Sequence, residues 1–345
     1  MRLVVIGGGV VGMAVAEGAR SRGLADGVVV LEQATLGSGA SSYAGASDLA
    51  LGWSDRHRRL VASSAAWHEA ASPAVEYRRS TPTLWALEDP EDAGRLAELV
   101  DEDVEPAPAV GSLPAGARTP GHVIDPRGLV KHLRAELLAA GASEVAEGER
   151  VTAVRVVDGS VVVSTPRREI EADRVVVCVG PWVLETCRSW GLEPPPVRTK
   201  RVFGYRWRSR DRQPDLTFVD LQEGVFLFPR VSEPGVYAMS VKHDVWDVEP
   251  VEGPSHPTPD AVARRAAERV LGDAELVERK VFVDTYTADD QPWVAPLEAT
   301  SRVWCVTGTH GSGVRLGVGL AHELLDLMWP AAGAATARVD AVRAG

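Results

Sequence analysis

The first 32 residues constrain the fold more than any other part of the chain. Residues 2–6 (RLVVI) form a short apolar run that ends in three glycines, as buried parallel strands do. Residues 10–20 have the pattern of a helix, and residues 28–31 (VVVL) form a second apolar run. A strand, a glycine turn, a helix and a strand in this order predict a βαβ unit, which requires a parallel sheet.

The glycine spacing in this turn is that of a dinucleotide-binding motif. Gly7, Gly9 and Gly12 follow the pattern G-x-G-x-x-G, whose glycines permit a tight turn, close approach to a pyrophosphate and close packing of helix on strand. Glu32 stands 20 residues beyond Gly12, at the end of the second strand, where a carboxylate can accept hydrogen bonds from a ribose diol. An acid there disfavours NADP, whereas FAD and NAD remain alternatives.

Two further glycine-rich segments favour a flavin. Residues 37–45 (GSGASSYAG) are small and rich in hydroxyls; they either place N–H groups and serine hydroxyls against phosphates or form an ordinary flexible turn. Residues 308–313 (GTHGSG) precede the last expected helix, at about residues 314–328. The N-terminal dipole of that helix suits a site beside a developing negative charge, such as one edge of a reduced flavin.

The remaining segments predict an interleaved architecture. Residues 126–140 predict an amphipathic helix, 151–166 a hairpin and 175–179 another buried strand. Residues 89–121 have the composition of a surface excursion around one acidic helix, and strands dominate residues 196–285. We expect an α/β plus α+β fold, with a discontinuous Rossmann-like FAD-binding domain (1–75, 122–190 and 286–345) and an antiparallel substrate-binding domain (76–121 and 191–285).

Composition limits the classes of partner. The net charge of −11 argues against a general nucleic-acid binder or a membrane-surface protein. The sequence has no apolar run long enough to predict a membrane span, and the glycines at positions 7–9 would break the helical core of a signal peptide. The three cysteines lack a zinc-like spacing, so we expect buried free thiols, no metal and a reducing, cytoplasmic setting.

Five segments together resemble the D-amino acid oxidase superfamily of FAD-dependent oxidoreductases, in its glycine oxidase and sarcosine oxidase branch. They are GGGVVG with the later LE, GASSYAG, ADRVVVCVGPWV, YTADDQPWVAP and VTGTHGSGVRLGVGLAHELLDL. The resemblance implies that FAD is held without a covalent bond, and that Val151 meets its adenine side through the backbone, in the strand after the amphipathic helix. The implied cofactor contacts are Gly7, Gly9, Val10, Val11, Gly12, Glu32, Gln33, Ser41, Ser42, Gly45, Val151, Gly180, Gly311, Gly313, Val314 and Arg315.

The same resemblance bears on the substrate site. Arg315 stands where sarcosine oxidases have a carboxylate-binding lysine, and an arginine can hold a carboxylate with two hydrogen bonds; the alternative is a surface cation. Asp284 stands where these relatives have a flavin-linked cysteine or a second carboxylate-binding arginine. We expect Asp284 to hold an ammonium group, to pair with Arg315 or to have a satisfied structural role. Either Lys242 or His243 would face the flavin.

These features predict the oxidation of an amine or amino acid. The resemblance implies that flavin N5 takes a hydride from glycine, an N-substituted glycine or a D-amino acid, giving an imine that hydrolyses, while O2 becomes H2O2. Phe226 and Phe228 predict an apolar pocket and a substrate larger than glycine, and we expect a monomer or homodimer. The alternatives are a dehydrogenase that passes electrons to a carrier, a nicotinamide-dependent oxidoreductase, a flavin hydroxylase and a non-catalytic flavin-binding module.

Overall fold

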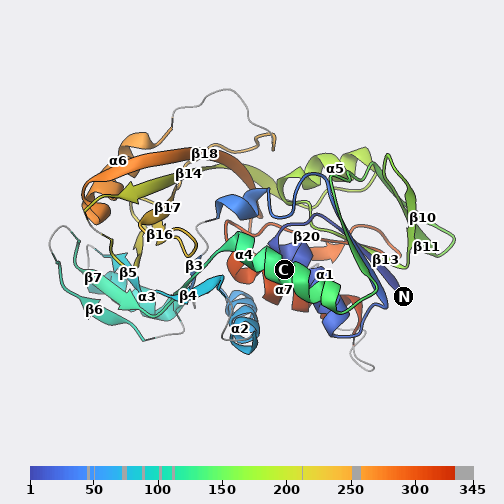
Figure 1. The fold of residues 1–345 in the computed structure, drawn as a ribbon, viewed down its shortest axis with the longest axis horizontal. Helices are drawn as coiled ribbons and strands as arrows, with labels where there is room; N and C mark the ends of the chain where they lie inside the picture. The colour runs from blue at the N-terminus through green and yellow to red at the C-terminus, as the bar shows by residue number, and fades with distance from the viewer. Residues whose placement is uncertain are drawn as a thin grey trace. The chain divides into compact units, whose positions relative to one another are not determined.

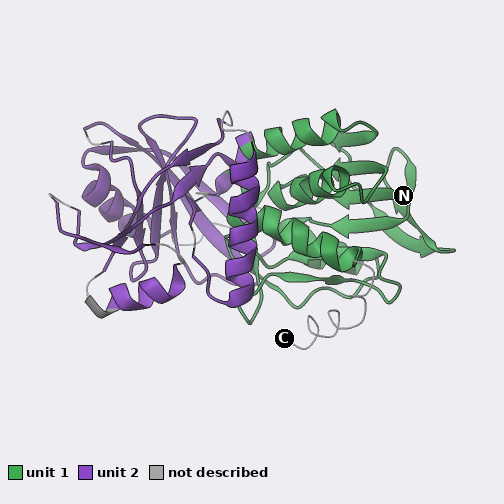
Figure 2. Ribbon diagram, turned by 90° about the horizontal axis from the view of Figure 1, so that it is seen from below, with its two compact units in different colours: residues 1–42, 129–199, 284–345 green, residues 43–128, 200–283 purple. Residues whose placement is uncertain are grey.

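The chain was analysed as a computed structural model that describes residues 1–330 except 45–46, 50, 72–75, 88–89, 101–102, 111–112, 212 and 251–257. It divides into two compact units (Figure 2). Unit 1 comprises residues 1–42, 129–199 and 284–345, and unit 2 comprises residues 43–128 and 200–283. Each unit therefore assembles its core from separated stretches of sequence.

A six-stranded sheet forms the centre of unit 1, in the order β19-β20-β13-β1-β2-β9. All neighbouring strands run parallel except the edge strand β19, which is antiparallel to β20. A parallel sheet is buried on both faces, which explains the continuous apolar runs of the sequence. The strands are β1 (Arg2–Ile6), β2 (Gly27–Glu32), β9 (Ser143–Glu147), β13 (Arg174–Val177), β19 (Trp293–Pro296) and β20 (Val303–Thr307).

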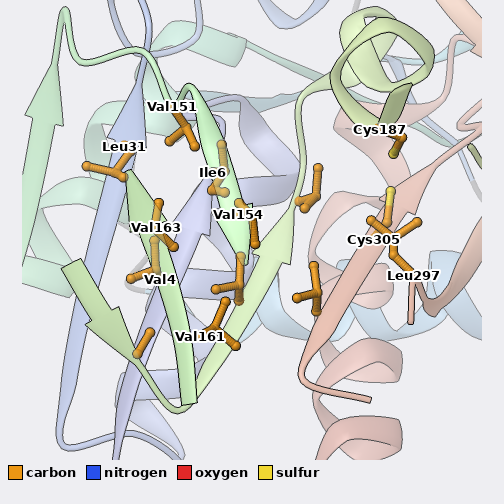
Figure 3. Close-up of a cluster of buried hydrophobic side chains, with 14 of the residues drawn as sticks. Val4, Ile6, Leu31, Val151, Val154, Val161, Val163, Cys187, Leu297 and Cys305 are labelled. Carbon is orange, nitrogen blue, oxygen red and sulfur yellow. The ribbon is translucent and has the colours of Figure 1, made fainter. Parts of the chain in front are cut away.

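A three-stranded antiparallel sheet covers one face of this parallel sheet. Val161 and Val163 of the small sheet are fully buried in one cluster with Val4 and Ile6 of β1 (Figure 3). The first turn of the small sheet has positive φ at both of its residues, Asp158 and Gly159, as a two-residue hairpin turn requires. Its strands are β10 (Ala153–Val157), β11 (Ser160–Ser164) and β12 (Glu169–Ala172), and the short helix α5 (Val183–Ser189) adds to the same cluster.

Two helices of unit 1 pack closely against each other (Figure 1). Helix α1 (Val10–Ser21) follows β1, and helix α7 (Gly313–Met328) follows β20. A Cβ added at Gly317 of α7 would lie 2.9 Å from a methyl carbon of Val10, so the absent side chain permits the close approach. The first turns of α1 and α7, each of which follows a strand and a loop, therefore lie next to each other. The third long helix of this unit, α4, begins in unit 2 and spans Pro126–Ala139.

An eight-stranded sheet forms the centre of unit 2, in the order β18-β14-β17-β16-β15-β5-β7-β6. Helix α6 (Asp260–Leu271) covers one of its faces and shares a buried cluster with Phe203, Phe218 and Leu227. The strands are β5 (Thr83–Ala86), β6 (Glu105–Ala107), β7 (Gly116–Thr119), β14 (Arg198–Ser209), β15 (Thr217–Asp220), β16 (Val225–Pro229), β17 (Val236–Val241) and β18 (Ala274–Tyr286).

The segment 89–121 is more than the predicted excursion around one helix. Helix α3 (Pro90–Leu99) is present, but β6 and β7 extend the large sheet at its edge. These strands were missed because they are short and largely polar, and one contains Pro106. Edge strands tolerate proline and exposed polar residues, so they lack the apolar pattern by which central strands are identified.

A small polar core in unit 2 includes residues that the sequence had assigned to the cofactor domain. Strands β3 (Ser47–Asp48), β8 (His122–Ile124) and β4 (Arg78–Ser80) form one sheet near helix α2 (Asp55–Ala70). Arg78 donates to the buried carboxylate of Asp48 at 3.0 Å and to Nδ1 of His122 at 3.2 Å. Residues 43–75 therefore lie in unit 2, because their strand and charges pair with that unit.

The combination of a parallel Rossmann-like sheet with a largely antiparallel one confirms the predicted fold class. The three cysteines are free and buried in the structure, as predicted. In the part of the chain that the structure describes, no helix is both long and apolar enough to cross a membrane.

Candidate cofactor and substrate site

The first glycine loop, residues 7–9, can be built only with glycine at its critical positions. Gly7 has a φ of 107°, and a Cβ there would lie 2.3 Å from the carbonyl oxygen of Cys178. A Cβ at Gly12 would lie 2.0 Å from the carbonyl oxygen of Gly7. These collisions involve backbone atoms that cannot move aside, so the motif glycines bring β1, β13 and α1 into close contact.

Polar groups gather at this loop from three separate segments. The carboxylate of Glu32 accepts hydrogen bonds from the N–H groups of Gly8 at 2.8 Å and Ala34 at 2.9 Å. The hydroxyl of Ser41, in the short 3₁₀ helix η1 (Ala40–Tyr43), accepts one from the N–H of Val10 at 3.2 Å. The acidic end of β2 and the amino end of α1 therefore lie side by side, as recognition of a ribose and a phosphate requires.

The other predicted cofactor residues differ in their surroundings. Ser42 directs its hydroxyl to the carbonyl oxygens of residues 38 and 39, and Gln33 is exposed directly after β2. Gly180 begins the 3₁₀ helix η2 (Gly180–Trp182) with a φ of 57°, and a Cβ there would meet no atom within 4 Å. Val11 lies in the first turn of α1. Gly45 lies outside the described residues.

Val151 is not in a strand, contrary to the prediction. The strand that follows helix α4 is β9, and Val151 lies in the link between β9 and β10. The prediction missed β9 because its sequence, SEVAE, is polar and pairs with only one neighbour at the sheet edge. Val151 itself is buried in the cluster shared by the two sheets (Figure 3).

The residues at the first glycine loop fit the ADP half of FAD. The backbone of this loop can be approached at Gly9, because an added Cβ there would meet only the hydroxyl of Ser41, at 3.2 Å. The amino end of α1 provides N–H groups and a favourable dipole for phosphates. Glu32 provides the carboxylate for a ribose. The structure thus has the donor, acceptor and space that a dinucleotide needs.

A second glycine loop, residues 308–312, connects β20 to α7. Three of its residues have a left-handed backbone: Gly308, His310 and Gly311, with φ of 69°, 52° and 73°. Gly311 is exposed, and a Cβ there would lie 3.9 Å or more from other atoms. Gly313 and Val314 form the first turn of α7, so their N–H groups point toward the loop. The second loop is exposed at Gly311, whereas Gly7 and Gly12 at the first loop are packed against backbone atoms.

Arg315 is buried at the start of α7. Arg315 is the third residue of the helix and only 7% exposed. Its Nη2 donates a hydrogen bond to the hydroxyl of Ser312 at 3.1 Å. The positive end of the helix dipole disfavours a cation at this position. An anionic ligand would offset that repulsion and could accept two guanidinium hydrogen bonds. The surface alternative is excluded by the burial.

Asp284 lies beneath the second glycine loop. Its carboxylate accepts hydrogen bonds from the N–H of Thr285 at 2.8 Å and of Gly311 at 2.7 Å. Burial raises the pKa of Asp284 to about 6, and the two hydrogen bonds offset part of that shift. Hydrogen bonds of this kind are what a structural role, one of the three alternatives for Asp284, requires. Its carboxylate is directed to the backbone of the loop.

Sequence analysis gave no role to His310 and Tyr286, which lie near Asp284. The Nε2 of His310 accepts a hydrogen bond from the N–H of Thr287 at 3.0 Å. The same Nε2 lies 2.8 Å from the hydroxyl oxygen of Thr287, and Nδ1 lies 3.4 Å from a carboxylate oxygen of Asp290. Burial lowers the pKa of His310, and the ring of Tyr286 packs edge-on against it at 4.9 Å. The motif letters GTHGSG show the histidine but not its partners.

Lys242 and His243 belong to unit 2 and lie on opposite sides of its large sheet. The ring of His243 packs edge-on against Phe203 at 5.1 Å, on the side covered by α6. Lys242 lies 5.7 Å above the ring of Phe226, on the other side. The structure therefore separates two residues that the sequence could not distinguish. Phe226 is half-buried and Phe228 is buried on that same strand, β16.

Comparisons with known proteins find relatives along nearly the whole chain. A glycine oxidase of Pseudomonas aeruginosa is 26% identical over 352 residues, covering 95% of this chain and 94% of its own length. L-proline dehydrogenase from P. horikoshii has a TM-score of 0.81 with 16% identity, covering 95% and 93% of the two chains. Glycine oxidase from Geobacillus kaustophilus has a TM-score of 0.77 with 20% identity, covering 95% and 94%. At these identities the structural likenesses establish the fold alone.

The family match covers nearly the whole chain. The sequence model of the FAD dependent oxidoreductase (DAO) family matches residues 2–327, which include both glycine loops and both units. This agrees with the FAD-binding geometry of the first loop and confirms the predicted superfamily and cofactor. The chain belongs to the DAO family of FAD-dependent oxidoreductases.

Proposed function

We propose that this enzyme oxidises the carbon–nitrogen bond of an amino acid or N-substituted amino acid whose carboxylate is bound by Arg315. The observation that carries the proposal is the burial of Arg315 at the positive end of α7, directly after the open loop of residues 308–312. A guanidinium at this position places positive charge and paired N–H donors beside the loop. A substrate carboxylate has the charge and the shape to accept them.

The protein's own groups would orient the substrate and exclude water. Arg315 would fix the carboxylate, and the N–H groups at the start of α7 would stabilise negative charge that develops beside them. FAD, when bound, supplies the two-electron acceptor. Both ring nitrogens of His310 have partners within the protein, Thr287 at Nε2 and Asp290 at Nδ1, so we do not assign it the role of a base. We therefore propose that the amine binds in its neutral form and that proton removal by the protein is unnecessary.

We propose O2 as the electron acceptor and an N-substituted glycine or a cyclic imino acid as the substrate. The support is the similarity to a glycine oxidase over 95% of the chain. The fold is also that of an L-proline dehydrogenase, so fold alone does not choose the acceptor.

A peroxide-release screen tests this proposal. The FAD-loaded enzyme should release H2O2 with N-substituted glycines, cyclic imino acids, glycine or D-amino acids, and little with amines that lack a carboxylate. Arg315→Ala should raise KM for the carboxylate substrates at least about tenfold, the effect of losing a charge-assisted hydrogen bond. Arg155→Ala is the matched control, because Arg155 is 60% exposed and pairs with the exposed Glu169. Equal preference for amines without a carboxylate would contradict the proposal.

A further inference from the structure

Residues at and just after the end of β18 hold the second glycine loop through backbone and side-chain hydrogen bonds. Asp284 accepts the N–H of Gly311 at 2.7 Å, and the hydroxyl of Thr285 accepts the N–H of Gly308 at 3.0 Å. The carbonyl oxygen of Thr285 accepts the N–H of His310 at 3.2 Å. The N–H of Thr287 bonds the ring of His310 at 3.0 Å. Residues 284–287 therefore form a clamp on residues 308–311.

The loop needs such a clamp because its backbone is unfavourable by itself. A left-handed backbone is uncommon for a residue with a side chain, and His310 adopts one between two glycines that do the same. Gly311 is exposed and has no side chain to hold it by packing. Hydrogen bonds from buried groups are then the main force that fixes the loop.

An aspartate has an advantage over an asparagine at position 284. Both of its carboxylate oxygens accept a backbone N–H, one from Thr285 and one from Gly311. An amide of the same size would present its NH2 group to one of these donors. The carboxylate is buried, which raises its pKa to about 6. The chain retains a costly buried acid whose hydrogen bonds go to a loop that is open to a ligand.

We propose that Asp284 is a positioning residue, whose carboxylate fixes the loop of residues 308–312 and thereby the direction of Arg315 at the start of α7. The N–H of Ser312 bonds the carbonyl oxygen of Thr309 at 2.8 Å. The hydroxyl of Ser312 accepts from Arg315 at 3.1 Å. The loop conformation thus determines where Ser312, and through it the guanidinium, is held. The part that concerns the substrate rests on the proposed function above.

Amide hydrogen exchange of the FAD-loaded protein tests the clamp without a substrate. In Asp284→Asn the amides of residues 308–312 should exchange about tenfold faster or more, since a buried bond to a charged acceptor is lost. Asp158→Asn is the control, because Asp158 is exposed in the β10–β11 turn of the same unit. Unchanged exchange in Asp284→Asn would overturn the proposal. If that variant does not fold, Thr285→Val removes the neutral side chain of the clamp and should accelerate exchange of the same amides by a smaller factor, and unchanged exchange there would overturn the clamp.

Steady-state kinetics of the same variants test whether the clamp directs Arg315. In Asp284→Asn the KM for carboxylate substrates should rise several-fold, while the KM for amines without a carboxylate stays within about twofold. The FAD dissociation constant, measured by flavin fluorescence, should rise less than about tenfold, because the first loop is untouched. Equal changes in KM for both substrate classes would overturn the positioning role. If Arg315→Ala itself spares carboxylate substrates, the proposed function fails while the exchange result still tests the clamp.

Discussion

Unit 1 contains a strand, a glycine loop and a helix twice, once at β1 and α1 and once at β20 and α7. At the first loop, backbone atoms lie 2.3 Å from a Cβ added at Gly7 and 2.0 Å from a Cβ added at Gly12, in the first turn of α1. In the second loop, a Cβ added at Gly311 would meet no atom closer than 3.9 Å, and the N–H of Gly311 is held by Asp284. The same local sequence pattern is therefore stabilised by packing in one loop and by hydrogen bonds in the other.

This difference has a physical consequence for the two ends of the cofactor site. A loop fixed by packing is rigid, and a substitution in it causes a collision. A loop fixed by buried hydrogen bonds weakens gradually, as each partner is removed. We expect the first loop to determine whether FAD binds at all, and the second to determine how well the substrate is oriented. Four variants or conditions test this contrast.

The largest effect should come from Gly12→Ala. Its Cβ would lie 2.0 Å from the carbonyl oxygen of Gly7, so we expect the unfolding free energy of the apoprotein to fall by about 4 kcal/mol. Binding of FAD should weaken more than about 100-fold. Urea denaturation and flavin fluorescence measure these changes. Gly94→Ala is the control, since an added Cβ there meets nothing within 4 Å; similar losses in both variants would refute the steric account.

The next effect concerns pH and Asp284. The folded protein holds this proton more tightly than the unfolded chain, because burial raises the pKa from 3.8 to about 6. Stability from this group is therefore fully present below about pH 4 and is lost as the pH rises through 6, by about 3 kcal/mol in all. The difference in unfolding free energy between the wild type and Asp284→Asn should therefore fall by most of this amount between pH 4 and 6.5. A flat difference would show that Asp284 is not desolvated.

A smaller effect should follow from Thr285→Val. This change keeps the shape but leaves the N–H of Gly308 and the hydroxyl of Thr307 without their acceptor. Buried donors without partners cost about 2 kcal/mol in unfolding free energy, to be measured by urea denaturation. Thr152→Val, whose hydroxyl bonds Ser164 at the exposed surface, should cost much less. An equally large loss of stability in Thr152→Val would show that burial of the Thr285 hydroxyl is not the cause.

The smallest effect should be that of Gly311→Ala. An alanine there meets no atom closer than 3.9 Å but must adopt a φ of 73°, which costs about 1 kcal/mol. The apoprotein should lose that much unfolding free energy and still bind FAD. Comparison with Gly12→Ala then separates backbone strain from collision. Complete loss of FAD binding in Gly311→Ala would mean that the two loops are equally intolerant.

The first loop was predictable from sequence because its geometry requires glycine at fixed spacing. Gly7, Gly9, Gly12 and Glu32 lie within one βαβ unit, so their order in the chain determines their positions. The buried runs that formed β1, β13 and β20 were predictable for the same reason, since both sheet faces demand apolar residues.

The clamp was not predictable, because it depends on the direction of individual N–H groups. Asp284 and Gly311 are 27 residues apart, and the sequence alone left three roles open for the acid. The choice between Lys242 and His243 depended on the register of β17, where a slip of one residue exchanges the two faces. Residues 43–75 lie in unit 2, which their sequence did not indicate. Asp48 among them pairs with Arg78, and Arg78 also bonds His122, and both of these come later in the chain.

Anaerobic reduction of the FAD-loaded enzyme tests the central claim most directly. An N-substituted glycine should remove the absorbance of the oxidised flavin in the wild type and in Arg155→Ala. In Arg315→Ala the same reduction should require at least about tenfold more substrate. An enzyme whose flavin stays oxidised with every amine that carries a carboxylate, or one that is reduced equally well without Arg315, would contradict the account.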